Sequence, residues 1–245
     1  MYSYSLLKKS LYFFVKFSIC ACRLRGFALG AGNILFPYDR NVFGNGSQPG
    51  KIRTVVIDAG HGGRDGGAVA EDGTLEKHLN LAVALQLKAL LESADIRVVM
   101  TRETDIELAS PDSPHKKADD LKAREKLAES CENAVFVSIH MNRFPVEKYK
   151  GLQVYYSENH ENSLILAQTI QNVSEETLRN TQDRKVKPAG DSIYLMAHLE
   201  IPAVLVECGF LSNPEELSLL KNEAYRKKLA MCLYASLMGY FAENA

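Results

Sequence analysis

The stretch Thr54-Val55-Val56-Ile57-Asp58-Ala59-Gly60-His61 decides the fold, because an apolar run there ends in a polar side chain. Two later stretches repeat the pattern, Ala134-Val135-Phe136-Val137-Ser138-Ile139-His140 and Ala203-Val204-Leu205-Val206-Glu207. Short apolar runs of this kind predict strands covered on both faces, as in a parallel sheet. Ligand sites of such sheets lie beyond the carboxyl ends of the strands. The sequence therefore predicts that two imidazoles and one carboxylate meet at one edge.

The rest of the chain alternates between helical and extended patterns. Working outward from the three runs, we expect a helix at 76–92, a strand at 96–101, a helix near 118–130, a strand at 152–156, a helix at 162–179 and a long helix near 223–242. Strands that alternate with helices predict βαβ units. The predicted fold is a single three-layer α/β domain, with a mostly parallel twisted sheet, helices on both faces and a metal site at the carboxyl edge of the strands.

Glu76 stands where an amphipathic helix is expected to begin. Apolar residues recur at helical spacing from Leu79 to Leu91, and Thr74 is a suitable N-cap. A glutamate in the first turn also suits the helix dipole, so taken alone Glu76 is best explained as a helix-opening residue. The two histidines predicted to lie at the same edge change that interpretation. Two histidines and one glutamate are the ligands of many catalytic zinc sites, which leave a fourth position open for water.

Several motifs together carry a family resemblance. They are His61-Gly62-Gly63-Arg64-Asp65-Gly66-Gly67-Ala68, Glu76-Lys77, Ser138-Ile139-His140-Met141-Asn142 and Pro202-Ala203-Val204-Leu205-Val206-Glu207-Cys208-Gly209-Phe210-Leu211-Ser212-Asn213. In this order they resemble the zinc-dependent N-acetylmuramoyl-L-alanine amidases of bacterial cell walls, over about residues 51–243. Many members read Asp-Pro-Gly-Ala after the first histidine. The variant here, Asp65-Gly66-Gly67-Ala68, is similar to the sporulation and germination branch of that family.

The resemblance implies a role for each candidate residue. His61, Glu76 and His140 would be the ligands of Zn²⁺, and Glu207 would be the catalytic carboxylate. A structural glutamate at the end of an apolar strand would need a cation or several hydrogen bonds to be tolerated there, and a metal offers that charge. Asp65 has two interpretations, a bond to the loop backbone, which we favour, or support for a ligand histidine. Asp58 has the same two and is left unassigned.

The implied reaction is hydrolysis of the amide between N-acetylmuramic acid and the L-alanine of the peptidoglycan stem peptide, in spore cortex maturation or germination. Two alternatives stay open. One is a zinc peptidase that cleaves within the stem peptide, and the other is a wall-binding relative without catalysis. The second alternative should have lost a ligand or Glu207, and all four residues are present. We also expect control by a separate activator protein or by location, and not by a segment that blocks the metal.

Composition and the N-terminal segment limit the locations and the partners that we expect for this protein. The chain of 245 residues has 46% apolar residues and a net charge of −1, and it lacks interleaved basic and aromatic residues, so we expect no nucleic-acid partner. In residues 1–26, Lys8-Lys9 precede a short apolar stretch, which predicts an export signal or a membrane-anchoring segment. Residues 27–50 are predicted to be a linker and residues 51–243 the catalytic domain. The enzyme is therefore expected to cross the cytoplasmic membrane to the cell wall or a periplasm-like space, which is the forespore intermembrane space in a sporulation amidase.

Overall fold

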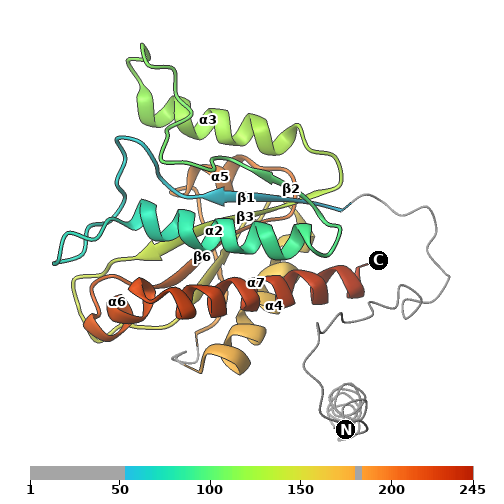
Figure 1. Ribbon diagram of the computed structural model, residues 1–245. Helices are drawn as coiled ribbons and strands as arrows, with labels where there is room; N and C mark the ends of the chain where they lie inside the picture. Colours follow the sequence, from blue (N-terminus) through green and yellow to red (C-terminus); the bar gives the residue numbers. More distant parts are fainter. Residues whose placement is uncertain (1–52, 180–183, 245) are drawn as a thin grey trace, which may run out of the picture. The chain divides into compact units, whose positions relative to one another are not determined.

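The computed structural model describes residues 53–179 and 184–244, all of which lie in one compact unit (Figure 1). The predicted export or anchoring segment, 1–26, and the predicted linker, 27–50, lie outside the described residues. Within the described part of the chain, no helix combines the length and the apolar composition that crossing a membrane requires.

A six-stranded sheet forms the middle layer, in the order β2-β1-β3-β6-β4-β5. The strands are β1 (Thr54–Ala59), β2 (Arg97–Met100), β3 (Ala134–Asn142), β4 (Gln153–Tyr156), β5 (Lys187–Pro188) and β6 (Ala203–Phe210). The pairs β1·β2, β1·β3 and β3·β6 are parallel, whereas β4 runs antiparallel to β6. The prediction of a mostly parallel sheet is therefore confirmed.

The three apolar runs of the sequence lie side by side as β1, β3 and β6. Every residue of β1 is buried, which is what coverage of both faces requires. Ala59 pairs with Ile139, and His140 pairs with Glu207. The sequence places the ends of these runs at His140 and Glu207, but β3 continues to Asn142 and β6 to Phe210. Because the three strands are parallel, the polar residues near their carboxyl ends still gather at one edge, as the sequence predicts.

Helices cover both faces of the sheet and complete the three layers. They are α2 (Glu76–Glu92), α3 (Lys116–Glu129), α4 (Glu161–Leu178), α5 (Tyr194–His198), α6 (Pro214–Lys221) and α7 (Glu223–Glu243). The larger apolar core lies between α2, α4, α7 and the sheet face that carries Val55 and Ile57. A smaller core lies between α3, α5 and the opposite face, which carries Val56, Phe136 and Leu205. Figure 1 shows α3 above the sheet and α7 below it.

Three short elements and one cap differ from the sequence prediction. The elements β5, α5 and α6 were not expected, because stretches of two to eight residues show little periodicity. Helix α2 begins at Glu76 as predicted, but Thr74 is not its N-cap. Leu75 holds that position in an extended conformation without a side-chain bond to the helix. The main-chain N–H of Thr74 instead donates to Asp72, which makes it part of the preceding turn.

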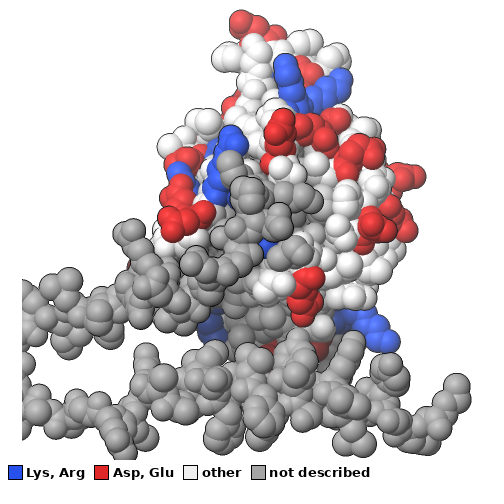
Figure 2. Space-filling view, turned by 90° about the vertical axis from the view of Figure 1, so that its right-hand side faces the viewer, with Lys and Arg blue, Asp and Glu red and all other residues white. Residues whose placement is uncertain are grey.

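The surface charge is mixed in sign. On the face shown in Figure 2, the described residues include both acidic and basic side chains, as a net charge of −1 allows.

Candidate active site

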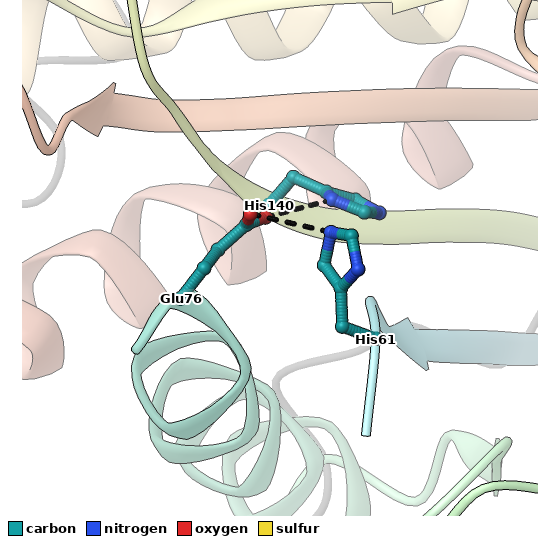
Figure 3. Close-up of side chains that lie close together, drawn as sticks. All are labelled: His61, Glu76 and His140. Atoms are coloured by element: carbon teal, nitrogen blue, oxygen red, sulfur yellow. Dashed lines mark hydrogen bonds and ion pairs between the residues drawn. The ribbon is translucent and has the colours of Figure 1, made fainter. Parts of the chain in front are cut away.

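The three predicted metal ligands converge at the carboxyl edge of the sheet (Figure 3). His61 follows β1, Glu76 is the first residue of α2, and His140 lies near the end of β3. One nitrogen or oxygen atom from each lies within 4.8 Å of those from the other two. The two imidazole rings meet edge to face, with their centroids 4.9 Å apart. Residues separated by up to 79 positions in the chain are thus brought to one point, and no other such group occurs among the described residues.

Glu76 is the centre of this cluster, and both of its oxygens are saturated with donors. Oε1 lies 2.9 Å from Nδ1 of His140 and accepts bonds of 3.1 Å from the Asn80 side chain and the Met141 main chain. Oε2 lies 3.2 Å from Nε2 of His61 and accepts a bond of 2.8 Å from the Ala68 main chain. Burial opposes ionisation, but the two imidazoles outweigh it and hold the pKa of Glu76 well below its ordinary value. Glu76 is therefore an anion fixed in one position.

His61 sits in a tight turn with φ at +62°, a left-handed conformation that costs free energy for a residue with a side chain. Its Nδ1 lies 3.0 Å from Oδ2 of Asp65, which leaves Nε2 to face Glu76. Oδ1 of Asp65 accepts a bond from the main chain of Gly67, so Asp65 combines both roles that the sequence suggested. Burial disfavours a charged ring, but Glu76 and then Asp65 raise the pKa of His61 to about 9.

Arg102 ties together the two segments that carry His61 and Glu76. Its Nη2 donates to the main-chain oxygen of Gly60, at 3.0 Å, and to that of Lys77, at 2.8 Å. Gly60 directly precedes His61 and Lys77 directly follows Glu76. Arg102 is 2% exposed, so these hydrogen bonds are made away from solvent, and the Gly60 oxygen accepts a further bond from the Asn80 side chain. We conclude that Arg102 fixes the spacing between the two residues.

Arg124, on α3, holds the same turn from the other face of the sheet. Its Nη2 donates to the main-chain oxygen of His61 at 2.8 Å, and Nη1 forms an ion pair of 2.6 Å with Asp58. Asp58 also accepts bonds from Thr101 and Ser138. Sequence reasoning missed both arginines. The available signal was Asp58 itself, because an aspartate inside an apolar strand requires a buried partner.

Two glycines make room for the cluster. A Cβ atom at Gly60 would lie 2.2 Å from Nε2 of His140, and one at Gly67 would lie 2.5 Å from Oε2 of Glu76. Gly67 also has a φ of +68°, which disfavours any other residue. Glycine at these two positions therefore lets the backbone pass close to the side chains of His140 and Glu76.

Glu207 lies beside the cluster but is not part of it. It pairs with His140 across β3 and β6, and cross-strand partners point to the same face of a sheet. Its Oε2 is buried without a hydrogen-bond partner in the described structure. This burial is the main cause that raises the pKa of Glu207 to about 7. Cys208, the next residue, is fully buried in the larger core, as expected of a packing residue.

The donor set and its surroundings fit Zn²⁺. Two imidazoles and a carboxylate are the ligands of many catalytic zinc sites. The atoms that now contact one another in the cluster are those that a cation would draw together. Asp65, on the far nitrogen of His61, is the kind of support that orients a metal-bound histidine. Glu207, the cross-strand partner of His140, has an oxygen without a hydrogen-bond partner among the described residues, and a free carboxylate oxygen can accept a proton.

Comparison with known proteins agrees with this geometry. The model of the Amidase_3 family, N-acetylmuramoyl-L-alanine amidase, matches residues 55–238. The chain belongs to this family. The match covers β3, β6, all of β1 except Thr54, and most of α7, so the family resemblance seen in the sequence is confirmed.

Individual relatives are similar over most of the chain. A germination-specific N-acetylmuramoyl-L-alanine amidase of Bacillus subtilis is 38% identical over 198 residues, which are 80% of this chain and 81% of the relative. The solved structure of the CwlD amidase from Clostridioides difficile, in complex with the GerS lipoprotein, is 40% identical. It covers 77% of this chain and 98% of its own, with a TM-score of 0.74. The catalytic domain of CwlV from Bacillus (Paenibacillus) polymyxa var. colistinus is 31% identical, covers 78% and 98%, and has a TM-score of 0.68.

Proposed function

We propose that this chain is a zinc-dependent N-acetylmuramoyl-L-alanine amidase, in which His61, Glu76 and His140 hold Zn²⁺ and Glu207 is the catalytic carboxylate. The observation that carries the proposal is the contrast between two glutamates at one edge of the sheet. Both oxygens of Glu76 accept from donors, and two of these donors are imidazoles, as expected of a metal ligand. Glu207 pairs with His140 on the neighbouring strand and has an oxygen without a hydrogen-bond partner among the described residues.

The chain's own residues account for the steps of hydrolysis. When bound, Zn²⁺ supplies Lewis-acid polarisation of the amide carbonyl and activation of water. Glu207 accepts the proton that water loses as its oxygen attacks the carbonyl carbon. When the C–N bond breaks, Glu207 gives this proton to the leaving nitrogen. The second proton of the water also passes to the amine, so the products are a carboxylate on the lactyl group and a protonated amino group on L-alanine. A pKa near 7 suits a group that must both take and release a proton.

A role in spore germination is the biological part of the proposal. The germination-specific amidase of Bacillus subtilis and CwlD of Clostridioides difficile support it. CwlD was solved in complex with the GerS lipoprotein, and we propose that this chain also acts with a separate partner protein. Measuring its amidase activity with and without candidate lipoproteins tests this point. If no such protein changes the rate or the zinc content, the partner proposal is wrong.

The proposed location follows from the substrate, because peptidoglycan lies outside the cytoplasmic membrane. We propose that residues 1–26 direct export or anchoring, that 27–50 form a linker, and that 51–243 are the catalytic domain. A chain that begins at residue 27 should remain soluble, bind zinc and hydrolyse peptidoglycan in vitro. Aggregation of this shortened chain would mean that the N-terminal segment belongs to the catalytic fold.

Digestion of purified peptidoglycan, followed by mass spectrometry, tests the reaction. The amidase should release intact stem peptides with free L-alanine amino termini. A chelator should abolish the release and added Zn²⁺ should restore it. Cleavage inside the stem would support the zinc peptidase alternative, and binding without any cleavage would support the wall-binding one.

A further inference from the structure

A cavity of about 430 Å³ opens beside the cluster, on the side covered by α3. His61 and His140 form part of its wall, and both side chains are partly exposed there. The opposite wall comes from the segment around Glu107 and the first turns of α3. A group seated in this cavity would lie next to the bond that the proposed amidase cleaves.

The four carboxylates that line the cavity are all satisfied. Each of their eight oxygens accepts at least one hydrogen bond, from donors that include Arg124, Arg64, His61 and main-chain N–H groups. The carboxylates are those of Asp58, Asp65, Glu107 and Asp120. These four carboxylates therefore have little left to offer a cation beyond the proposed metal site.

The cationic groups are not all satisfied. The Nη1 atom of Arg64 has no acceptor among the described residues, because Nε and Nη2 make the bonds to Glu107. The ammonium group of Lys117 makes no hydrogen bond within the described structure. It lies 3.8 Å from Asp65, whose nearer oxygen is already bonded to His61, and its side chain is 77% exposed. An anionic ligand requires hydrogen-bond donors that are free and neighbouring carboxylates that already have partners.

The cavity also has an apolar part, formed by Leu121 and Leu195. Cationic donors at the mouth and aliphatic groups inside suit a carboxylate that is carried on a short carbon chain. Of the two sides of the scissile amide, the lactyl-sugar side is uncharged, whereas the stem peptide carries acidic residues. The charge thus distinguishes the two halves of the substrate.

We infer that this cavity is a subsite for an acidic residue of the stem peptide, with Lys117 and Arg64 binding its carboxylate. The inference rests on the proposed amidase function and deepens it. It also orients the substrate, because the stem peptide then extends from the cluster toward α3 and the glycan extends away from it. Lys117 and Arg64 are specificity residues in this scheme and take no part in the chemical step.

Two muropeptides test the inference if they differ only at the residue after L-alanine, which carries a free carboxylate in one and a carboxamide in the other. Lys117→Met keeps the aliphatic length and removes the charge. It should raise KM for the acidic muropeptide by about 3- to 10-fold, the size expected for one partly exposed charge-assisted bond. The change for the carboxamide should be less than about 2-fold. Arg64→Met should act in the same direction, and added salt should reduce the wild-type preference for the acid.

Lys126→Met is the matched control, because Lys126 is exposed on the same helix and does not line the cavity. It should leave KM for both muropeptides unchanged. Equal effects of Lys117→Met on the acid and the carboxamide, or no effect on either, would overturn the subsite. So would an equal effect of Lys126→Met. If the zinc-loaded wild-type protein cleaves neither muropeptide at the lactyl amide, the proposed function is wrong and the subsite with it. If it cleaves both with the same KM, the amidase stands and the subsite alone is refuted.

Discussion

Two glutamates at the same edge of the sheet have opposite surroundings. Glu76 begins a helix, receives donors from five different residues and has a pKa held well below its ordinary value. Glu207 lies within β6, three residues before its end at Phe210, and has a buried oxygen without a hydrogen-bond partner among the described residues and a pKa raised to about 7. Burial by itself raises the pKa of both carboxylates. The difference lies in what the fold places around each carboxylate.

This difference matches the two proposed roles, a metal ligand for Glu76 and a proton carrier for Glu207. A carboxylate that must hold a cation works best when it is already ionised and immobile. One that must accept and release a proton works best when neither state is strongly favoured at the working pH. Glutamate can therefore serve either as a metal ligand or as a proton carrier at the same edge of a sheet, because the surrounding groups set the pKa of its carboxyl.

The largest effect is expected from removing the saturated glutamate. Glu76→Ala should lose bound zinc and, with it, all measurable amidase activity, because the metal would keep only two protein ligands. His61→Ala and His140→Ala should do the same. Zinc content by elemental analysis, with circular dichroism to confirm folding, measures this. Full zinc occupancy in any one variant would remove that residue from the ligand set.

The next largest effect is expected from the unpartnered glutamate. Glu207→Gln keeps the shape of the side chain and leaves all three ligands in place, so zinc should be retained. Activity should fall by about 10²–10⁴-fold, the usual contribution of a positioned acid–base group. Substrate affinity should change little, since the lost interaction acts in the transition state.

Zinc stoichiometry beside turnover on peptidoglycan distinguishes the outcomes for this variant. A Glu207→Gln protein without zinc would make Glu207 a ligand and erase the contrast with Glu76. Near-normal turnover would mean that another group carries the proton.

A smaller effect is expected at Arg102, which spaces Glu76 from His61. Arg102→Lys keeps the charge but cannot donate to all of the main-chain oxygens that Arg102 binds, which include those of Gly60 and Lys77. Zinc affinity should fall by about 10- to 100-fold, as for other residues that orient ligands from outside. Competition with a chelator measures the affinity. The visible absorption of the cobalt-substituted protein reports the ligand geometry.

Arg226→Lys serves as the control for Arg102→Lys, because Arg226 also donates to a main-chain oxygen, that of Leu220 on α6. Its zinc affinity should equal that of the wild type. If Arg102→Lys lowers only the melting temperature of the metal-free protein and leaves affinity and spectrum unchanged, Arg102 stabilises the fold without positioning the ligands.

The central part of this structure could be predicted from the sequence because it depends on short-range patterns. Apolar runs gave β1, β3 and β6, and periodicity gave α2 and α7 to within a residue. Parallel strands then place His61, His140 and Glu207 at one edge without further information. The motifs that carry the family resemblance supplied Glu76, which periodicity alone would leave as a helix-opening residue.

What the sequence did not predict depends on contacts between distant residues. Arg102 and Arg124 lie in segments with no apparent motif, and their importance appears only when the fold brings them to the turn at His61. Helix α6 was missed although Asn213 and Pro214 are a strong helix-start signal, because only eight residues follow the cap. Short elements are held by tertiary packing more than by their own sequence.

The smallest effect on catalysis is expected at Asp58, a third carboxylate of this edge, which resembles Glu76 in its saturation but contacts no predicted ligand side chain. Burial opposes its ionisation, yet Arg124 and the hydroxyl groups of Ser138 and Thr101 lower its pKa. Asp58→Asn should therefore reduce the free energy of unfolding by about 3 kcal/mol at pH 7, since it leaves Arg124 without one of its two carboxylate partners. Zinc stoichiometry should remain that of the wild type.

The destabilisation caused by Asp58→Asn should depend on pH. Because the pKa of Asp58 is lower in the folded than in the unfolded chain, its ionisation stabilises the fold above the unfolded value of about 3.9. The stabilisation is lost as the pH falls through the folded value. Urea unfolding of wild type and Asp58→Asn from pH 7 downward should thus show a difference that is constant to about pH 5 and then shrinks. A difference that does not shrink in acid would mean that Asp58 acts through its shape and hydrogen bonds and not through its charge. In that case saturation with donors, which Asp58 shares with Glu76, would not by itself identify a carboxylate that the fold needs as an anion.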